Sequence, residues 1–174
     1  MPAWVGNDTF FSDDNIEYHV RWLDCAKEHP EIGPINWLGI WNERSWRAAE
    51  PAFVHRSIAL SRETKSKNCR THCALVFRLV RVARGSAEYV KATRRALDAA
   101  GHSTTRLVLP DSLFAVPDSL WEALATDSEL VAAVGAVGTH YACDAPEEVR
   151  ERFGLKYWSS EDFSTVSDWA GAGC

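Results

Sequence analysis

The chain alternates between two patterns of apolar residues, helical spacing and short continuous runs. Residues 16–26 carry apolar side chains near helical spacing and follow an acidic pair, Asp13 and Asp14, that can cap a helix. This predicts a helix to about Glu28, ended by the breakers of "HPEIGP". The next run, "INWLGIW" at 35–41, is short and rich in Ile and Trp, which is typical of a buried parallel strand.

The same alternation continues through the second half of the chain. The pattern predicts, in order, a helix at 86–101, a strand at 105–111, a helix capped at Asp118 and broken near Asp127, a strand from Val134 that leads into His140, a charged helix at 145–154 and a strand at 156–164. Strands that alternate with helices indicate an α/β fold with a parallel sheet.

Each predicted strand ends in polar residues: Asn42 and Glu43, then Asp111, then His140 and Tyr141, then Glu161 and Asp162. In a (β/α)₈ barrel, the carboxyl ends of the strands face one mouth, where the active site is built. Asp is common before helices, so Asp111 is better interpreted as a cap or loop residue. Glu is a poor cap, and Glu43 and Glu161 stand among aromatic residues, which makes these two carboxylates the stronger candidates.

Two carboxylates at the ends of different strands fit the hydrolysis of a glycosidic bond. Hydrolysis with retention needs one carboxylic acid to protonate the leaving oxygen and one carboxylate to attack the anomeric carbon, about 5–5.5 Å apart. Burial near Trp41 or Trp46 would help the acid keep its proton, while the nucleophile must stay ionised.

Two long motifs, "WLGIWNERS" and "LKYWSSEDFST", occur in this order, together with "PAWVGN", "LVLPDS", "VGTHYA" and a terminal "GAGC". In these stretches the chain resembles the galactocerebrosidase (β-galactosylceramidase) family of retaining glycosidases, whose catalytic domain is a (β/α)₈ barrel. The resemblance implies that Glu43 is the acid/base, that Glu161 is the nucleophile and that Asn42 binds the sugar 2-hydroxyl. It makes His140, Tyr141 and Ser164 further candidates for the substrate pocket.

The resemblance also implies a biological setting. The expected reaction is cleavage of the β-galactosyl bond of galactosylceramide in a lysosome, without a metal or organic cofactor, because two carboxyl groups supply the proton and the nucleophile. The expected partner is a glycosphingolipid, presented by a lipid-transfer activator protein. A glycosidase of the same clan that acts on another β-sugar remains an alternative.

The chain departs from the family in two ways. Residues 1–174 correspond only to strands four to seven of the barrel, so an inactive fragment is a second alternative. Residues 51–87 have no counterpart that we recognise and carry eight Lys or Arg against one acid, a charge of +7 that leaves −12 for the rest of the chain. This segment is interpreted as a translated intron, a mis-joined exon or a lineage-specific loop.

Net charge gives no general reason to expect a nucleic acid partner, since the chain carries −5 with a pI near 5.7. A basic arm at 51–87 that binds anionic lipid or nucleic acid is a weaker alternative, because Phe53 and Phe77 are its only aromatic residues. No apolar run predicts a transmembrane segment, and the first residues do not resemble a signal peptide.

The cysteines do not predict a metal site. Cys69, His72 and Cys73 lie close together but lack a fourth ligand at the usual spacing of zinc sites. Five cysteines are too few and too scattered for a disulfide scaffold, so their number does not identify the redox compartment.

Overall fold

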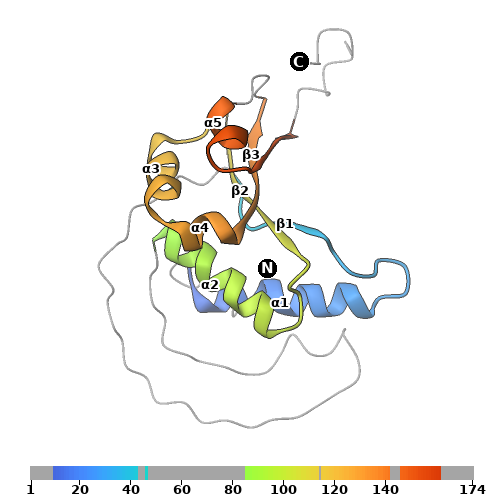
Figure 1. The fold of residues 1–174 in the computed structure, drawn as a ribbon. Coiled ribbons are helices and arrows are strands. Elements are labelled where there is room, and N and C mark those ends of the chain that lie inside the picture. Colours follow the sequence, from blue (N-terminus) through green and yellow to red (C-terminus); the bar gives the residue numbers. More distant parts are fainter. Residues whose placement is uncertain (1–9, 43–45, 47–84, 114, 142–145, 162–174) are drawn as a thin grey trace, which may run out of the picture.

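A computed structural model describes residues 10–42, 46, 85–113, 115–141 and 146–161. One parallel sheet contains four strands in chain order: β1 (Trp37–Gly39), β2 (Arg106–Leu113), β3 (Val134–His140) and β4 (Lys156–Glu161). The helices described with them are α1 (Asp13–Glu28) before β1, α2 (Ser86–Ala99) before β2, α3 (Asp118–Thr126) and α4 (Ser128–Ala133) before β3, and α5 (Glu147–Glu151) before β4. The predicted parallel α/β architecture is confirmed (Figure 1).

The helices form a chain of neighbours. α1 contacts α2, α2 contacts α4, α4 contacts α3, and α5 contacts β4. Leu107 and Leu109 of β2 and Val137 of β3 are fully buried in the same core as Leu97 of α2 and Leu120 of α3. Burial of apolar surface contributes about 25 cal/mol per Å², so this shared core holds the strands in place beneath their helices.

The sheet is strongly curled. Trp37 of β1 and Trp158 of β4 come from the two outer strands, yet their ring centroids are only 4.3 Å apart. Arg106 and Lys156 lie over the Trp37 ring, with their charged groups 5.3 and 5.5 Å from its centroid. Contact between side chains of outer strands requires a concave face, which a segment of an α/β barrel also has.

The start of α1 differs from the prediction by one residue. The N-cap is Ser12, whose hydroxyl accepts a hydrogen bond from the backbone N–H of Asn15 at 3.3 Å. Asp13 and Asp14 occupy the first turn, where negative charge interacts favourably with the helix dipole. The assignment of the cap to an acidic residue is therefore wrong, because serine fills the same role one position earlier.

The predicted break near Asp127 is confirmed, since α3 ends and α4 begins there. The Asp127 side chain caps α4 by accepting from the Leu130 N–H at 2.9 Å. It also accepts from Lys91 Nζ at 2.7 Å, and this hydrogen bond lowers the pKa of the Asp127 carboxyl. The predicted cap at Asp118 is wrong: Pro117 occupies that position and Asp118 lies in the first turn of α3.

Two predicted segments are shorter or outside the described part of the chain. The strand expected at 35–41 is limited to Trp37–Gly39, after which Ile40 and Trp41 are buried in the core. The basic segment predicted at 51–87 lies outside the described residues, except that Gly85 is the N-cap of α2 and Ser86 and Ala87 begin this helix.

Candidate active site

The carboxyl ends of three neighbouring strands meet in one polar cluster. Asp111 comes from β2, His140 ends β3 and Glu161 ends β4. Parallel register places His140 opposite Glu161, and it places Leu113 opposite His140 on the other side. The structure thus brings together three of the polar strand ends that the sequence singles out.

His140 lies between two carboxylates. Its side chain is only 1% exposed, with Nε2 3.4 Å from Asp111 Oδ1 and Nδ1 3.5 Å from Glu161 Oε2. The Glu161 side chain is 49% exposed, whereas that of Asp111 is 17% exposed. The imidazole therefore lies between an enclosed carboxylate and one that is open to solvent.

Tyr141 contacts the second oxygen of the same carboxylate. Its hydroxyl donates a hydrogen bond to Glu161 Oε1, and its backbone N–H donates to the Glu161 carbonyl oxygen at 2.9 Å. The residue has a left-handed φ of 57°, which is uncommon for a bulky side chain. Contacts at both carboxylate oxygens orient Glu161 while leaving it accessible.

Asp111 belongs to this cluster, which corrects its interpretation as a cap or loop residue. It lies inside β2, where the ladder to β3 is irregular between Pro110 and Ser112. Its Oδ1 accepts a hydrogen bond from the Ser160 hydroxyl on β4. The spacing of strand residues gives no signal for this contact, because a bulge changes the direction of the side chain.

The end of β1 supplies a further predicted site residue. Asn42 is exposed at a bend that follows Trp41. Trp41 is 6% exposed and packs against the rings of Phe11, Tyr89 and Trp46, so the backbone that leads into Asn42 is anchored in the core. The other two predicted residues, Glu43 and Ser164, lie outside the described residues.

The family model of glycosyl hydrolase family 59 matches residues 1–67 and 77–174. The chain belongs to this family. The match includes both motifs that carry the candidate glutamates. Of the segment predicted as an insertion, it covers residues 51–67 and 77–87 and omits residues 68–76. The predicted membership of a glycosidase family is confirmed.

Known relatives of this family 59 chain agree with the match. Proteins named galactocerebrosidase from Macaca mulatta and Homo sapiens are 27% identical to it, and that from Mus musculus is 28% identical, each over 178 aligned residues. The alignments cover 100% of this chain and 20% of each relative. The chain therefore spans about a fifth of the length of the curated relatives that it matches.

The described residues of the family 59 chain show no group of three or more His, Cys, Asp or Glu side chains that could hold a metal ion. The cluster at Cys69, His72 and Cys73 lies outside them. Cys25 on α1 is disulfide-bonded. Within the same described ranges, no helix is both long and apolar enough to cross a membrane.

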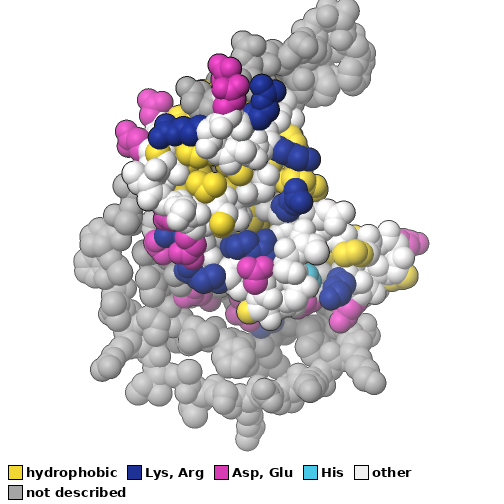
Figure 2. Space-filling view, in the orientation of Figure 1, with side chains coloured by type: hydrophobic (Ala, Val, Ile, Leu, Met, Phe, Trp, Pro, Cys, Tyr) yellow, Lys and Arg dark blue, Asp and Glu magenta, His cyan; other side chains and the backbone are white. Residues whose placement is uncertain are grey.

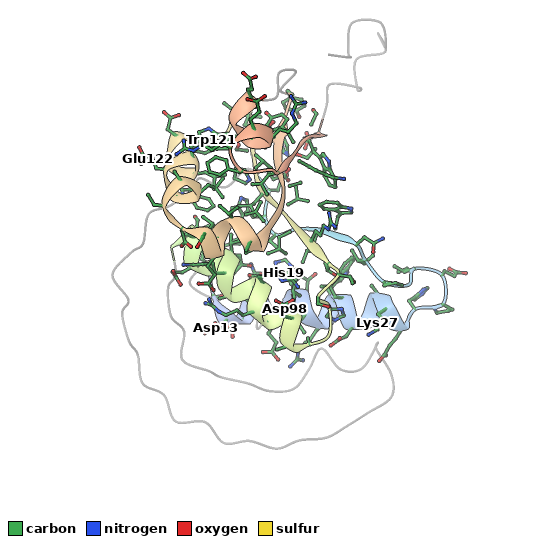
Figure 3. The ribbon with its side chains drawn as sticks, in the orientation of Figure 1. Asp13, His19, Lys27, Asp98, Trp121 and Glu122 are labelled. Carbon is green, nitrogen blue, oxygen red and sulfur yellow. The ribbon has the colours of Figure 1, made fainter. Side chains whose placement is uncertain are left out.

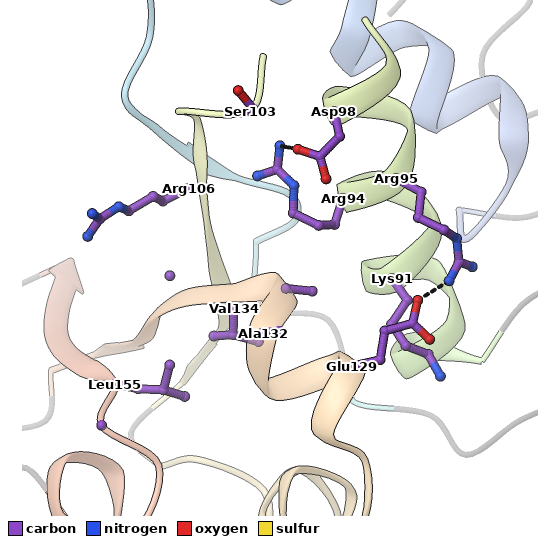
Figure 4. A pocket seen from close by; sticks show the side chains of 13 residues that line it. Lys91, Arg94, Arg95, Asp98, Ser103, Arg106, Glu129, Ala132, Val134 and Leu155 are labelled. Atoms are coloured by element: carbon purple, nitrogen blue, oxygen red, sulfur yellow. Dashed lines mark hydrogen bonds and ion pairs between the residues drawn. The ribbon is translucent and has the colours of Figure 1, made fainter. Parts of the chain in front are cut away.

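A cavity of about 610 Å³ lies at the opposite, amino-terminal end of the strands (Figure 4). Two of its basic side chains are paired within its own wall: Arg94 contacts Asp98 at 2.8 Å, and Arg95 forms an ion pair with Glu129. Lys and Arg side chains are also visible on the face shown in Figure 2. The amino-terminal end of a barrel serves stability rather than catalysis, so this cavity is not the candidate active site.

His19 supports the end of β1 from α1 (Figure 3). It forms a hydrogen bond with the backbone of Ile40, two residues before Asn42, and burial lowers its pKa to about 4. Its Nε2 is buried and has no hydrogen-bond partner among the described residues. His19 is therefore neutral at physiological pH and acts as a structural support of the strand end.

Proposed function

We propose that the protein carrying this chain is a retaining glycoside hydrolase in which Glu161 is the nucleophile and Glu43 is the acid/base. The observation that carries the proposal is the placement of the Glu161 carboxylate in a family 59 chain. It ends a parallel strand, it is half exposed, and Tyr141 and His140 approach its two oxygens. A nucleophile needs this combination of fixed orientation and access to the substrate.

The reaction has two steps. A Glu161 oxygen bonds to the anomeric carbon while the bond from that carbon to the leaving oxygen breaks, and Glu43 donates a proton to the leaving oxygen. Glu43 then takes a proton from water, which attacks the anomeric carbon and releases the sugar and the Glu161 carboxylate. Asn42 binds the sugar 2-hydroxyl, and His140, Tyr141 and Ser164 line the pocket. Two carboxyl groups supply the chemistry, so no cofactor is required.

We propose galactosylceramide as the substrate, because the relatives that align over the whole chain are named galactocerebrosidase. The products are galactose and ceramide, and an activator protein presents the lipid. In this proposal β1 to β4 are strands four to seven of a (β/α)₈ barrel, and their curl supports this assignment. The disulfide bond of Cys25 supports a route through an oxidising compartment toward the lysosome.

The experiment is a comparison of aryl β-galactoside and aryl β-glucoside hydrolysis by the full-length protein. Faster turnover of the galactoside and hydrolysis of galactosylceramide are expected. Faster turnover of the glucoside would instead support a glycosidase of the same clan with another sugar specificity. Absence of hydrolysis of both substrates would contradict the proposed function.

A further inference from the structure

Asp111 is separated from Glu161 by a whole strand, yet the two carboxylates contact the same imidazole. We propose that Asp111 is a positioning residue, which acts through His140 to hold the Glu161 carboxylate in its reactive orientation. This inference rests on the proposed function, because it assigns Asp111 a role only if Glu161 is the nucleophile.

The backbone conformation of β2 directs the Asp111 side chain toward His140. In the ladder between β2 and β3, Pro110 pairs with Gly138 and Ser112 pairs with Thr139, so Asp111 is an additional residue on β2. It has a left-handed φ of 54°. A bulge of this kind redirects a side chain and is frequent beside active sites. A non-glycine residue held in this conformation costs energy that the surrounding contacts must offset, which indicates a specific use of the side chain.

A glycine on the intervening strand opens the path from β2 to β4. A Cβ atom at Gly138 would lie 3.3 Å from Asp111 Oδ1 and 3.2 Å from Ser160 Oγ. Without it, the Ser160 hydroxyl reaches over β3 and donates a hydrogen bond to Asp111, and it also lies 3.2 Å from the Thr139 carbonyl oxygen. Asp111 is therefore tied to β4 at the residue that directly precedes Glu161.

The charge of Asp111 orients His140. Because a carboxylate oxygen lies beside each ring nitrogen, His140 can face both only as the imidazolium, which donates from Nε2 toward Asp111 and from Nδ1 toward Glu161 Oε2 and so fixes the plane of the ring. Because the ring is 1% exposed, no bulk water competes for either nitrogen. Tyr141 donates to the other oxygen of Glu161, so the carboxylate is oriented from both sides. Loss of the Asp111 charge releases His140 and therefore weakens one of the two contacts that orient Glu161.

Attack on the anomeric carbon depends on this orientation, since a displacement of about 1 Å can cost on the order of 100-fold in rate. Asp111→Asn keeps the size of the side chain and an oxygen that can accept from Ser160, and it removes only the charge. We expect kcat to fall by roughly 10- to 100-fold with little change in KM, because substrate binding does not depend on Asp111. The thermal unfolding temperature should stay close to that of the unaltered protein.

The measurement uses the full-length protein, an aryl β-galactoside and inactivation by 2-deoxy-2-fluoro-β-galactosyl fluoride. Inactivation joins a Glu161 oxygen to the anomeric carbon and releases fluoride, which takes the electron pair of the broken bond. Asp111→Asn should slow inactivation in proportion to its loss of kcat. Asp98→Asn, the same substitution at the opposite end of the sheet, should keep both rates.

The outcomes separate the two proposals. If the unaltered protein hydrolyses no galactoside and resists the inactivator, the proposed function fails. If it is inactivated normally and Asp111→Asn is inactivated at the same rate, only the role of Asp111 is overturned. If Asp111→Asn does not fold, Ser160→Ala decides the question, because it removes the hydroxyl that ties Asp111 to β4. A several-fold loss of kcat in Ser160→Ala supports the inference, and an unchanged kcat overturns it.

Discussion

Glu161 shows how single residues of this chain combine chemistry with structure. Its carboxylate ends β4, is 49% exposed and is approached by Tyr141 and His140, which are adjacent in sequence at the end of β3. The sequence predicted all three as candidates, because polar residues at strand ends of a parallel sheet share one edge. It did not predict that Asp111 joins them, since that contact depends on a bulge in β2 and on the absence of a side chain at Gly138.

At the residue scale, His19 makes stability depend on pH. Its pKa is about 4 in the folded protein and near 6.5 when unfolded, so between these values the unfolded chain binds a proton that the folded chain does not. The free energy of unfolding should therefore fall as pH drops from 6.5 to 4, by at most on the order of 3 kcal/mol from this group.

This dependence is measurable by chemical denaturation of the full-length protein at several pH values. His19→Gln should make the free energy of unfolding depend less on pH between 4 and 6.5. His29→Gln controls for the loss of an exposed imidazole. A slope that His19→Gln leaves unchanged would show that burial of His19 does not destabilise its protonated form.

At the element scale, the order of helices and strands was predictable, whereas their ends were less so. The two apolar periodicities identify α1, α2 and β2 to β4, because each element must direct its apolar side chains to a common core. β1 is shorter than its apolar run, since its pairing with β2 ends at Gly39 while Ile40 and Trp41 are still buried in the core. Ser12 replaces the acidic pair as the cap of α1 because all three residues are suitable caps, and local hydrogen bonding decides between them.

Substitution of Gly135 tests how closely β2 and β3 approach each other in the curled sheet. A Cβ atom there would lie 2.5 Å from Arg106 Cβ and 3.1 Å from the Trp37 ring, so β2 and β3 would have to separate. Gly135→Ala should lower the free energy of unfolding by about 1–3 kcal/mol, which denaturant titration measures. Gly39→Ala on β1 is the matched control, because nothing lies within 4 Å of its Cβ position. Equal stability of the two variants would contradict the close approach of β2 and β3.

At the scale of the whole molecule, four strands do not close a barrel. In the described residues, β1 and β4 each pair on one side only, and the concave face carries Trp37 and Trp158. A (β/α)₈ barrel closes by pairing its eighth strand with its first, at about 250 residues. Unpaired strand edges favour association between chains over a defined pocket.

Residues 1–174 expressed alone should therefore be inactive, although both candidate glutamates are present. Size-exclusion chromatography should show association, thermal unfolding should lack a sharp transition, and aryl β-galactoside should not be hydrolysed. A soluble monomer with a cooperative transition, whose turnover Glu43→Gln abolishes, would contradict this expectation. The half barrel would then be sufficient for catalysis.

The role of Glu161 as the nucleophile is tested most directly by locating the covalent intermediate. The full-length protein is inactivated with 2-deoxy-2-fluoro-β-galactosyl fluoride and digested, and the labelled peptide is sequenced by mass spectrometry. We expect one label, on the carboxyl group of Glu161 in the peptide that contains "KYWSSEDFS", and no label in Glu161→Gln. A label on Glu43, on Asp162 or on any other residue would contradict the assignment of Glu161 as the nucleophile.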